Sequence, residues 1–271
     1  YMLSTLLSQP RSHYFPALCC MVAAFLWGVL WYPLRLLEEM GVSGVWSTLI
    51  IFSSATLILV PHYVVIRAEF SKHKFDYLLL GIFAGWTNLA FILAMLEGEV
   101  VRVLLLFYLS PIWAILLAIL ILHERLTRTS FFALVLAMTG AVLMLWDADL
   151  FLGHDLHYAD LFAISSGMAF AAANIVVRKI GETPIIVKVS ASWLGVIALT
   201  IVAIFITKPS LPELTFQSGA FAFFVGFPAM FIMAWTTYYG VTHLPIQRSS
   251  IIFLLEIIAG AVSAAWLTNE I

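Results

Sequence analysis

Charged residues are scarce in this chain of 271 residues, since Asp, Glu, Lys and Arg together make up only 10% of it. An average soluble domain contains about 25%. Hydrophobic residues make up 63% and the mean hydropathy is +1.06. This excludes a cytosolic enzyme, a secreted disulfide scaffold and a disordered chain, because only a bilayer can accommodate so much apolar surface. The apolar runs are continuous, which excludes the alternating strands of a β-barrel pore.

Several motifs that would indicate other chemistry are also missing. The two cysteines, Cys19 and Cys20, are neighbours on a predicted helix and point about 100° apart, so an internal disulfide is not expected. There is no Walker A motif for ATP and no aspartate at the centre of a predicted span. His123-Glu124 begins a zinc-protease motif, but Thr127 stands where the second histidine should be. We therefore expect no cofactor and no metal, and the net charge of −2 gives no reason to expect nucleic acid.

Long apolar stretches predict an all-α polytopic membrane protein. A hydrocarbon core about 30 Å thick requires about 20 apolar residues of helix. Nine such stretches are predicted, at 16–37, 43–66, 76–96, 99–122, 129–147, 158–180, 185–207, 215–242 and 245–268. If the N-terminus is cytoplasmic, ten of the 13 Lys and Arg residues fall on the cytoplasmic side. The positive-inside rule therefore predicts that orientation.

The two halves of the sequence can be superposed as an internal repeat. A shift of 143 residues places Arg35 on Arg178, and a shift of 146 places Arg102 on Arg248 and Glu124 on Glu270. Residues 1–147 are then a first repeat of five helices, 148–157 an external loop, and 158–271 a second repeat that contains four. A repeat with an odd number of helices enters the membrane upside down, as in many secondary transporters. We expect ten helices in two inverted repeats, with the tenth missing after Glu270.

Several motifs of the sequence resemble those of a known family. Tyr108-Leu-Ser-Pro111-Ile-Trp113, His123-Glu-Arg-Leu-Thr127 and Gly140-Ala-Val-Leu-Met144 resemble the EamA-type repeat of the drug/metabolite transporter superfamily. Phe253-Leu-Leu-Glu256 to Thr268-Asn269-Glu270 is similar to a second copy. The family commonly has a Glu-Pro pair here, whereas this chain has Ser110-Pro111 in one half and Glu256-Ile257 in the other. The resemblance implies a ten-helix transporter of small metabolites, acting as a single chain in a bacterial-type inner membrane.

Glu256 is the most informative polar residue, because it lies near the middle of the last predicted span. A carboxylate at the bilayer centre costs about 2.5–3.5 kcal/mol on insertion scales, so Glu256 is expected to face the protein interior. It is a candidate for coupling transport to protons or for binding an amine. The alternative is a structural carboxyl group that is hydrogen-bonded to a neighbouring helix.

Aromatic and amide side chains supply a candidate central cavity, because aromatic faces attract ammonium groups and amides are costly in lipid. The candidates are Trp27, Trp31, Asn88, Tyr108, Phe170, Asn174, Trp235 and Tyr239. Phe107, Trp113 and Phe253 are further aromatic residues that could contribute to the cavity. The alternative is that the aromatic residues face lipid or form interfacial belts.

Three further groups of residues are candidates for hinges, gates and helix packing. They are prolines, arginines near helix ends, and glycines. Pro111 and Pro228 lie within apolar stretches and are predicted hinges or simple kinks. Arg35, Arg102, Arg178 and Arg248 lie near helix ends, where they either anchor the helix or form gates, Arg102 with Glu97 or Glu99. Small residues predict close packing among the third, sixth and ninth helices; they are Gly81-x-x-x-Gly85, the run Ser165-Ser-Gly167 through Ala171-Ala-Ala-Asn174, and Ala259-Gly-Ala261.

The sequence as a whole predicts a secondary active transporter that exports a small metabolite, such as an amino acid or an amine, by alternating access. Its expected partners are the substrate, protons and membrane lipid. Efflux of lipophilic cations by the same fold is the nearest alternative. An intramembrane enzyme and a membrane subunit without transport activity are the alternatives from other classes.

Overall fold

The computed structural model describes residues 14–42, 44–98, 100–145, 157–181 and 183–267. In these ranges every regular element is helical. The predicted partners Glu99 and Glu270, and almost all of the loop 148–157, lie outside the described residues. The elements are α2 (Tyr14–Val29), α3 (Trp31–Glu39), α4 (Gly44–Ala55), η1 (Thr56–His62), α5 (Tyr63–Phe70), α6 (Lys74–Glu97), α7 (Val100–Phe107), α8 (Ser110–Ile121), α9 (Arg128–Leu145), α10 (Tyr158–Lys179), α11 (Ile185–Thr207), α12 (Phe216–Phe224), η3 (Val225–Met230), α13 (Phe231–His243), α14 (Ile246–Phe253) and α15 (Leu255–Leu267).

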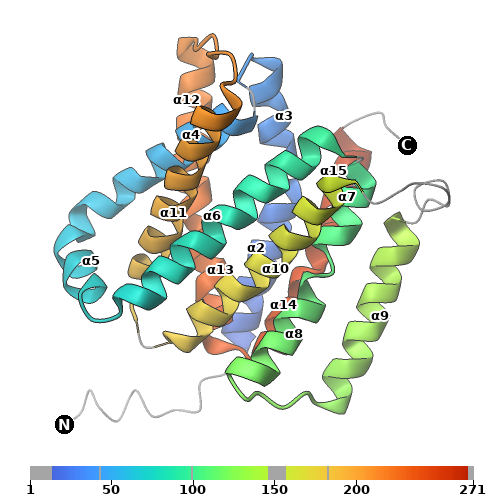
Figure 1. The fold of residues 1–271 in the computed structure, drawn as a ribbon. Helices are drawn as coiled ribbons and strands as arrows, with labels where there is room; N and C mark the ends of the chain where they lie inside the picture. Colours follow the sequence, from blue (N-terminus) through green and yellow to red (C-terminus); the bar gives the residue numbers. More distant parts are fainter. Residues whose placement is uncertain (1–13, 43, 99, 146–156, 182, 268–271) are drawn as a thin grey trace.

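Eight helical stretches of the described chain are long and apolar enough to cross a membrane, which confirms a polytopic all-α membrane protein. They are Tyr14–Glu39, Gly44–Phe70, Lys74–Met95, Arg102–Ile121, Tyr158–Lys179, Ile185–Thr207, Phe216–His243 and Ile246–Ser263. The remaining predicted span, 129–147, corresponds to α9, whose apolar part Arg128–Gly140 is shorter. Figure 1 shows α9 at the edge of the bundle, where it packs only lightly against α7 and α14.

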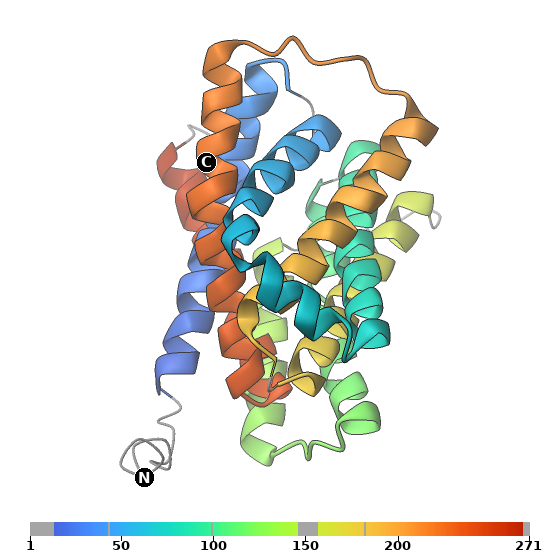
Figure 2. The same ribbon diagram turned by 90° about the vertical axis from the view of Figure 1, so that its left-hand side faces the viewer.

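The helices form one bundle in which each half of the chain packs against the other (Figures 1 and 2). In one set of contacts α6 packs against α10 and α11, while α7 and α8 pack against α10. In a second set α13 packs against α2, α12 and η3 against α4, and α14 and α15 against α2. Helices α8 and α14 also meet each other. The predicted repeat places the first four spans on the sixth to ninth. Under this correspondence, each helix contact in the first set has a counterpart in the second.

Five of the membrane-crossing stretches contain a non-α segment or an interruption inside the apolar region, one of them at Leu30, between α2 and α3. One stretch is interrupted at Tyr108–Leu109, so that α8 begins at Ser110 with Pro111 in its first turn. Another is interrupted at Leu254, between α14 and α15, where no proline is present. Pro228 lies inside the π-helical segment η3, and Pro61 lies inside the 3-10 segment η1. Because proline has no N–H to donate, it loosens the helical ladder at these points.

Glycine allows two central helices to cross at backbone distance. Gly81 and Gly85 on α6 face Gly195 on α11, and a methyl group added at Gly85 would lie 2.6 Å from the Gly195 carbonyl oxygen. The predicted close approach is therefore present, but its partner is the seventh predicted span, α11, rather than the sixth or ninth. α6 does pack against the sixth predicted span, α10, while its two glycines face α11.

Candidate functional site

A small pocket lies where the helices interrupted at Tyr108–Leu109 and at Leu254 meet. It is lined by residues before and after each interruption and by Phe170 of α10; they are Phe107, Tyr108, Ser110, Pro111, Ala114, Phe170, Ser250, Phe253, Leu254 and Glu256. The pocket has room for about one water molecule. A metabolite would therefore enter only after the surrounding helices move apart, so this conformation is closed around its centre.

Glu256 supplies the carboxylate of the pocket. It lies in the first turn of α15 and is partly exposed. Tyr108, from the facing interruption, lines the same pocket. This carboxylate can hold a proton or pair with an ammonium group.

Three phenylalanines form the apolar wall of the pocket. The rings of Phe107 and Phe170 lie with their centroids 5.8 Å apart, and those of Phe170 and Phe253 lie 6.2 Å apart. Phe107 also contacts Tyr108 edge-on at 5.6 Å. The wall therefore draws on α7, α10 and α14, and it places aromatic faces near the carboxylate, where they favour an organic cation.

Close backbone approaches position the two interruptions. A methyl group added at Gly167 of α10 would lie 2.7 Å from the carbonyl oxygen of Phe107. One added at Gly28 of α2 would similarly approach the carbonyl oxygen of Glu256 and the side chain of Ala259. Because α2 and α10 can come so near, each interruption is braced by one helix of the other half.

The structure brings Tyr108, Phe170 and Glu256 together but places the other predicted cavity residues outside this pocket. The indole nitrogen of Trp27 donates to Thr237 Oγ1 at 3.1 Å, and that of Trp31 donates to Ser263 Oγ at 2.9 Å. These bonds connect α2 and α3 to α13 and α15. In this conformation both tryptophans act as ties between helices.

The remaining predicted cavity residues are also engaged elsewhere. Trp235 stacks on Tyr239 with ring centroids 5.0 Å apart. Asn88 donates to the Ala84 carbonyl one turn earlier on α6 at 3.1 Å, and Asn174 is buried within α10. Trp113, one turn beyond Ser110, packs against the central core, and its buried Nε1 has no hydrogen-bond partner among the described residues. Their role in binding stays a prediction.

At one end of the bundle a buried ion pair joins α7 to α10. Arg102 donates from Nε to Asp160 Oδ1 at 2.8 Å and from Nη2 to Asp160 Oδ2 at 2.7 Å. Asp160 also accepts from the His157 amide at 3.0 Å, as part of the capping box that begins α10. The partner expected from the sequence, Glu97, instead accepts from the Tyr158 hydroxyl at 2.5 Å. The bidentate pair closes this end, and we call it the Arg102 latch.

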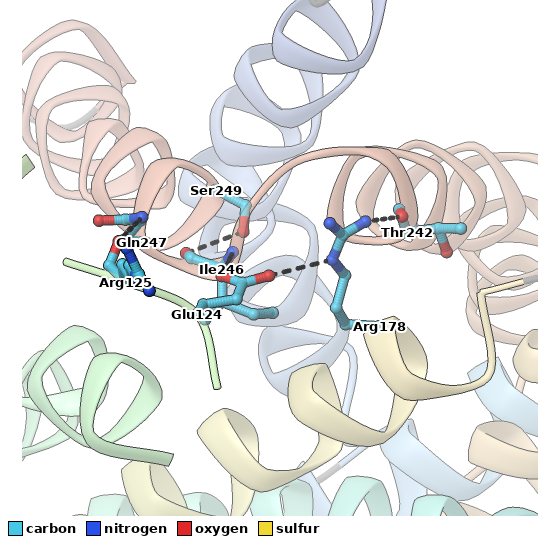
Figure 3. A network of polar contacts seen from close by, with 7 residues as sticks. All are labelled: Glu124, Arg125, Arg178, Thr242, Ile246, Gln247 and Ser249. Carbon is cyan, nitrogen blue, oxygen red and sulfur yellow. Dashed lines mark hydrogen bonds and ion pairs between the residues drawn. The ribbon is translucent and has the colours of Figure 1, made fainter. Parts of the chain in front are cut away.

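At the opposite end a larger network joins four segments (Figure 3). His123 has a left-handed backbone, φ 55°, which turns the chain after α8 and presents Glu124. Glu124 Oε1 accepts from Arg178 Nε at 3.3 Å, and Oε2 accepts from the Ile246 amide at 3.0 Å. Arg178 also donates to the Thr242 carbonyl oxygen. We call these contacts, together with those of Gln247 and Lys188 described next, the Glu124 network.

Two residues that the sequence did not single out extend this network. Gln247 donates to the Arg125 carbonyl at 2.9 Å and accepts from the Thr127 amide at 3.2 Å. Lys188 is completely buried and donates to Thr242 Oγ1 at 2.8 Å and to the Val177 carbonyl at 3.1 Å. Lys188 lies three residues inside an apolar stretch, and that position was the only available signal that it is buried.

The other two predicted gate arginines lie outside both clusters. The side chain of Arg35 is 45% exposed, and its Nε lies 3.6 Å from Glu39 of the same helix. Arg248 is exposed at the start of α14. A gate role for these two arginines stays a prediction.

Comparisons with known proteins agree with this architecture. Residues 15–146 match the model of the EamA-like transporter family. The match spans almost half of the chain and identifies it as EamA-like over these residues. The family is one of membrane transporters of the drug/metabolite type rather than of enzymes.

Solved structures support the same fold. Eleven of their chains match the EamA-like chain. One, described simply as "Crystal structure of protein", has a TM-score of 0.78 at 15% identity and covers 94% of this chain and 88% of its own. At that identity the likeness concerns the fold alone. A comparison with curated proteins gives no match.

Proposed function

We propose that this EamA-like protein is a secondary transporter that exports a small amine-bearing metabolite, such as an amino acid or an amine, across a bacterial-type inner membrane. The observation that carries the proposal is the pocket between the two interrupted helices, where Glu256 and Tyr108 face three phenylalanines. In transporters, discontinuous helices near the midplane commonly form the substrate site. Since one chain supplies every lining residue, a monomer suffices.

The proposed movement is alternating access between two inverted repeats. The matching contacts of the two halves support it, as do the corresponding interruptions at Tyr108 and Leu254, which are 146 residues apart. The Arg102 latch and the Glu124 network would open in turn, and this conformation has both closed. The Glu124 end carries Arg125, Arg128, Arg178 and Lys188, which supports a cytoplasmic location for it and for the N-terminus.

Proton coupling through Glu256 is part of the proposal. A carboxylate that pairs with either a proton or an ammonium group exchanges one for the other, because the two cations compete for one site. Lipophilic-cation efflux is the second candidate, and the same pocket favours it because aromatic walls and one carboxylate suit such cations equally well.

Uptake into proteoliposomes tests the proposal. Labelled amino acids, small amines and one lipophilic cation, tetraphenylphosphonium, are supplied with and without a pH gradient. We expect saturable uptake that the gradient stimulates, and Glu256→Gln should abolish the stimulation. The matched control is Glu213→Gln, an exposed carboxylate in the connection between α11 and α12.

Each outcome has a distinct meaning. Saturable uptake that responds to the gradient equally in both variants would remove Glu256 from coupling. Saturable uptake of the lipophilic cation alone would favour the second candidate. Absence of saturable transport for every compound would overturn the proposal that this pocket is a transport site.

A further inference from the structure

Two serine hydroxyls in the pocket lack the hydrogen bond that similar residues elsewhere in the bundle make. Ser110 and Ser250 are only 4% and 7% exposed, and both line the pocket. Neither hydroxyl has a hydrogen-bond partner among the described residues. A serine on a membrane helix normally bonds back to a carbonyl of the preceding turn, as Ser190 and Ser249 do here. The two pocket hydroxyls are therefore donors that are available to a ligand.

The two helix starts at the pocket differ in charge. α15 has the carboxylate of Glu256 in its first turn, whereas the first turn of α8 has no acidic residue and no capping side chain. Under the 146-residue shift Ser110 corresponds to Glu256, so one half of the pocket has a hydroxyl where the other has a carboxylate. Pro111 has no N–H, and the Ile112 and Trp113 amides donate to the Leu109 carbonyl, so the serine hydroxyls rather than backbone amides are the donors that this end of the pocket offers. The pocket thus has a carboxylate at the start of α15 and a hydroxyl donor at the start of α8.

We propose that Ser110 and Ser250 form an anion-binding end of the pocket, so that the transported compound is a zwitterion. Its ammonium group pairs with Glu256, and its carboxylate accepts hydrogen bonds from the two serine hydroxyls at the start of α8. The inference rests on the proposed transport function and narrows its substrate class. Simple amines, which lack the carboxylate, leave the two donors unsatisfied and bind more weakly.

A matched set of probes separates the two ends of the site. Leucine carries both charges, 3-methylbutylamine is leucine without its carboxylate, and 4-methylpentanoate is leucine without its ammonium group. Corresponding trios built on alanine and on phenylalanine cover smaller and larger side chains. Saturable uptake of all nine compounds is measured in proteoliposomes that contain the whole chain.

In at least one trio we expect the zwitterion to be taken up with a kcat/KM at least tenfold above that of its amine. Ser110→Ala and Ser250→Ala should each reduce this preference about tenfold while uptake of the amine stays within twofold. Ser249→Ala is the control, because Ser249 is equally buried next to Ser250 but donates to the Ile246 carbonyl at 3.1 Å.

The results distinguish this inference from the proposed function. Amines that are transported as well as the zwitterions, or serine variants that keep the preference, would overturn the anion-binding end and leave amine transport standing. Equal losses for amine and zwitterion in the serine variants would also overturn it, since they indicate a packing role. No saturable uptake of any probe would overturn the transport function and this inference together.

Discussion

The two ends of the bundle are closed by different means. The Arg102 latch is one bidentate pair whose side chains are 14% and 4% exposed. The Glu124 network spreads over two ion-pairing side chains, backbone amides and carbonyls, Gln247 and Lys188, and its ion pair is 29% and 17% exposed. Among the described residues, the strongest contact at one end is thus a single largely buried charge pair, beside the Tyr158–Glu97 hydrogen bond, while closure of the other end is divided among many weaker bonds. A single substitution should therefore remove most of the stabilisation of the first end, but only part of the stabilisation of the second.

The largest effect is expected from Asp160→Asn, because it removes the carboxylate that accepts both hydrogen bonds of the largely buried Arg102 latch. Breaking a buried ion pair from one side costs about 3–5 kcal/mol. The free energy of unfolding, measured by titration with SDS, should fall by that amount. Asp76→Asn is the control, since its partner Lys179 is 54% exposed and such a pair contributes about 0–1 kcal/mol. Equal losses in the two variants would contradict a special role for the Arg102 latch.

A smaller effect is expected from Glu124→Gln. The amide oxygen of glutamine still accepts from the Ile246 amide, while the charge opposite Arg178 is lost, so we expect a loss of about 1.5–3 kcal/mol. Hydrogen exchange provides the sharper readout. The Ile246 amide should stay protected in Glu124→Gln and lose protection in Glu124→Ala. Identical exchange in the two variants would show that Glu124 does not hold this amide.

Gln247→Ala tests whether the Glu124 network fails in steps. Two hydrogen bonds to the turn after α8 are lost, and their net contribution is about 0.5–1.5 kcal/mol each. Exposed Gln217→Ala serves as the control and should change unfolding by less than about 0.5 kcal/mol. A loss as large as that of Asp160→Asn would mean that both ends are closed by a single essential contact.

The smallest effect is the coupling between the ends. Asp160 and Arg178 lie 18 residues apart on one helix, which at 1.5 Å per residue is roughly 27 Å. At that distance the losses of Asp160→Asn and Gln247→Ala should add within about 0.5 kcal/mol in the closed conformation. A larger deviation would reveal that the two ends communicate through the bundle.

Apolar length and charge predicted the helices well, because the bilayer imposes the same length on every span. The interruption at Tyr108–Leu109 could be anticipated from Pro111. The one at Leu254 has no proline, and only its register with Tyr108 could have indicated it. Tyr108, Phe170 and Glu256 were predicted for the site, and the structure places them around one pocket.

The partners of the other candidates could not be predicted in the same way. Trp27 and Trp31 lie on a stretch that is apolar on nearly every face, so hydropathy does not indicate which face meets Thr237 or Ser263. Arg102 lies near Glu97 in sequence, but Asp160 is presented to it by the capping box at the start of α10. Ser110 and Ser250 were missed because a serine in an apolar run carries no charge signal. What distinguishes these two serines is that their hydroxyls do not bond back to a carbonyl of the preceding turn, and only the structure shows this.

The glycine crossing of α6 and α11 has a consequence for how the protein is made. α6 is synthesised well before α11, so Gly81 and Gly85 first enter the bilayer facing lipid instead of Gly195. Nothing in an apolar stretch hinders insertion at that stage, since insertion depends on hydropathy and not on shape. A bulkier residue at Gly85 would therefore leave membrane insertion unchanged. It would disrupt the fold only later, when α11 in the second half of the chain packs against α6.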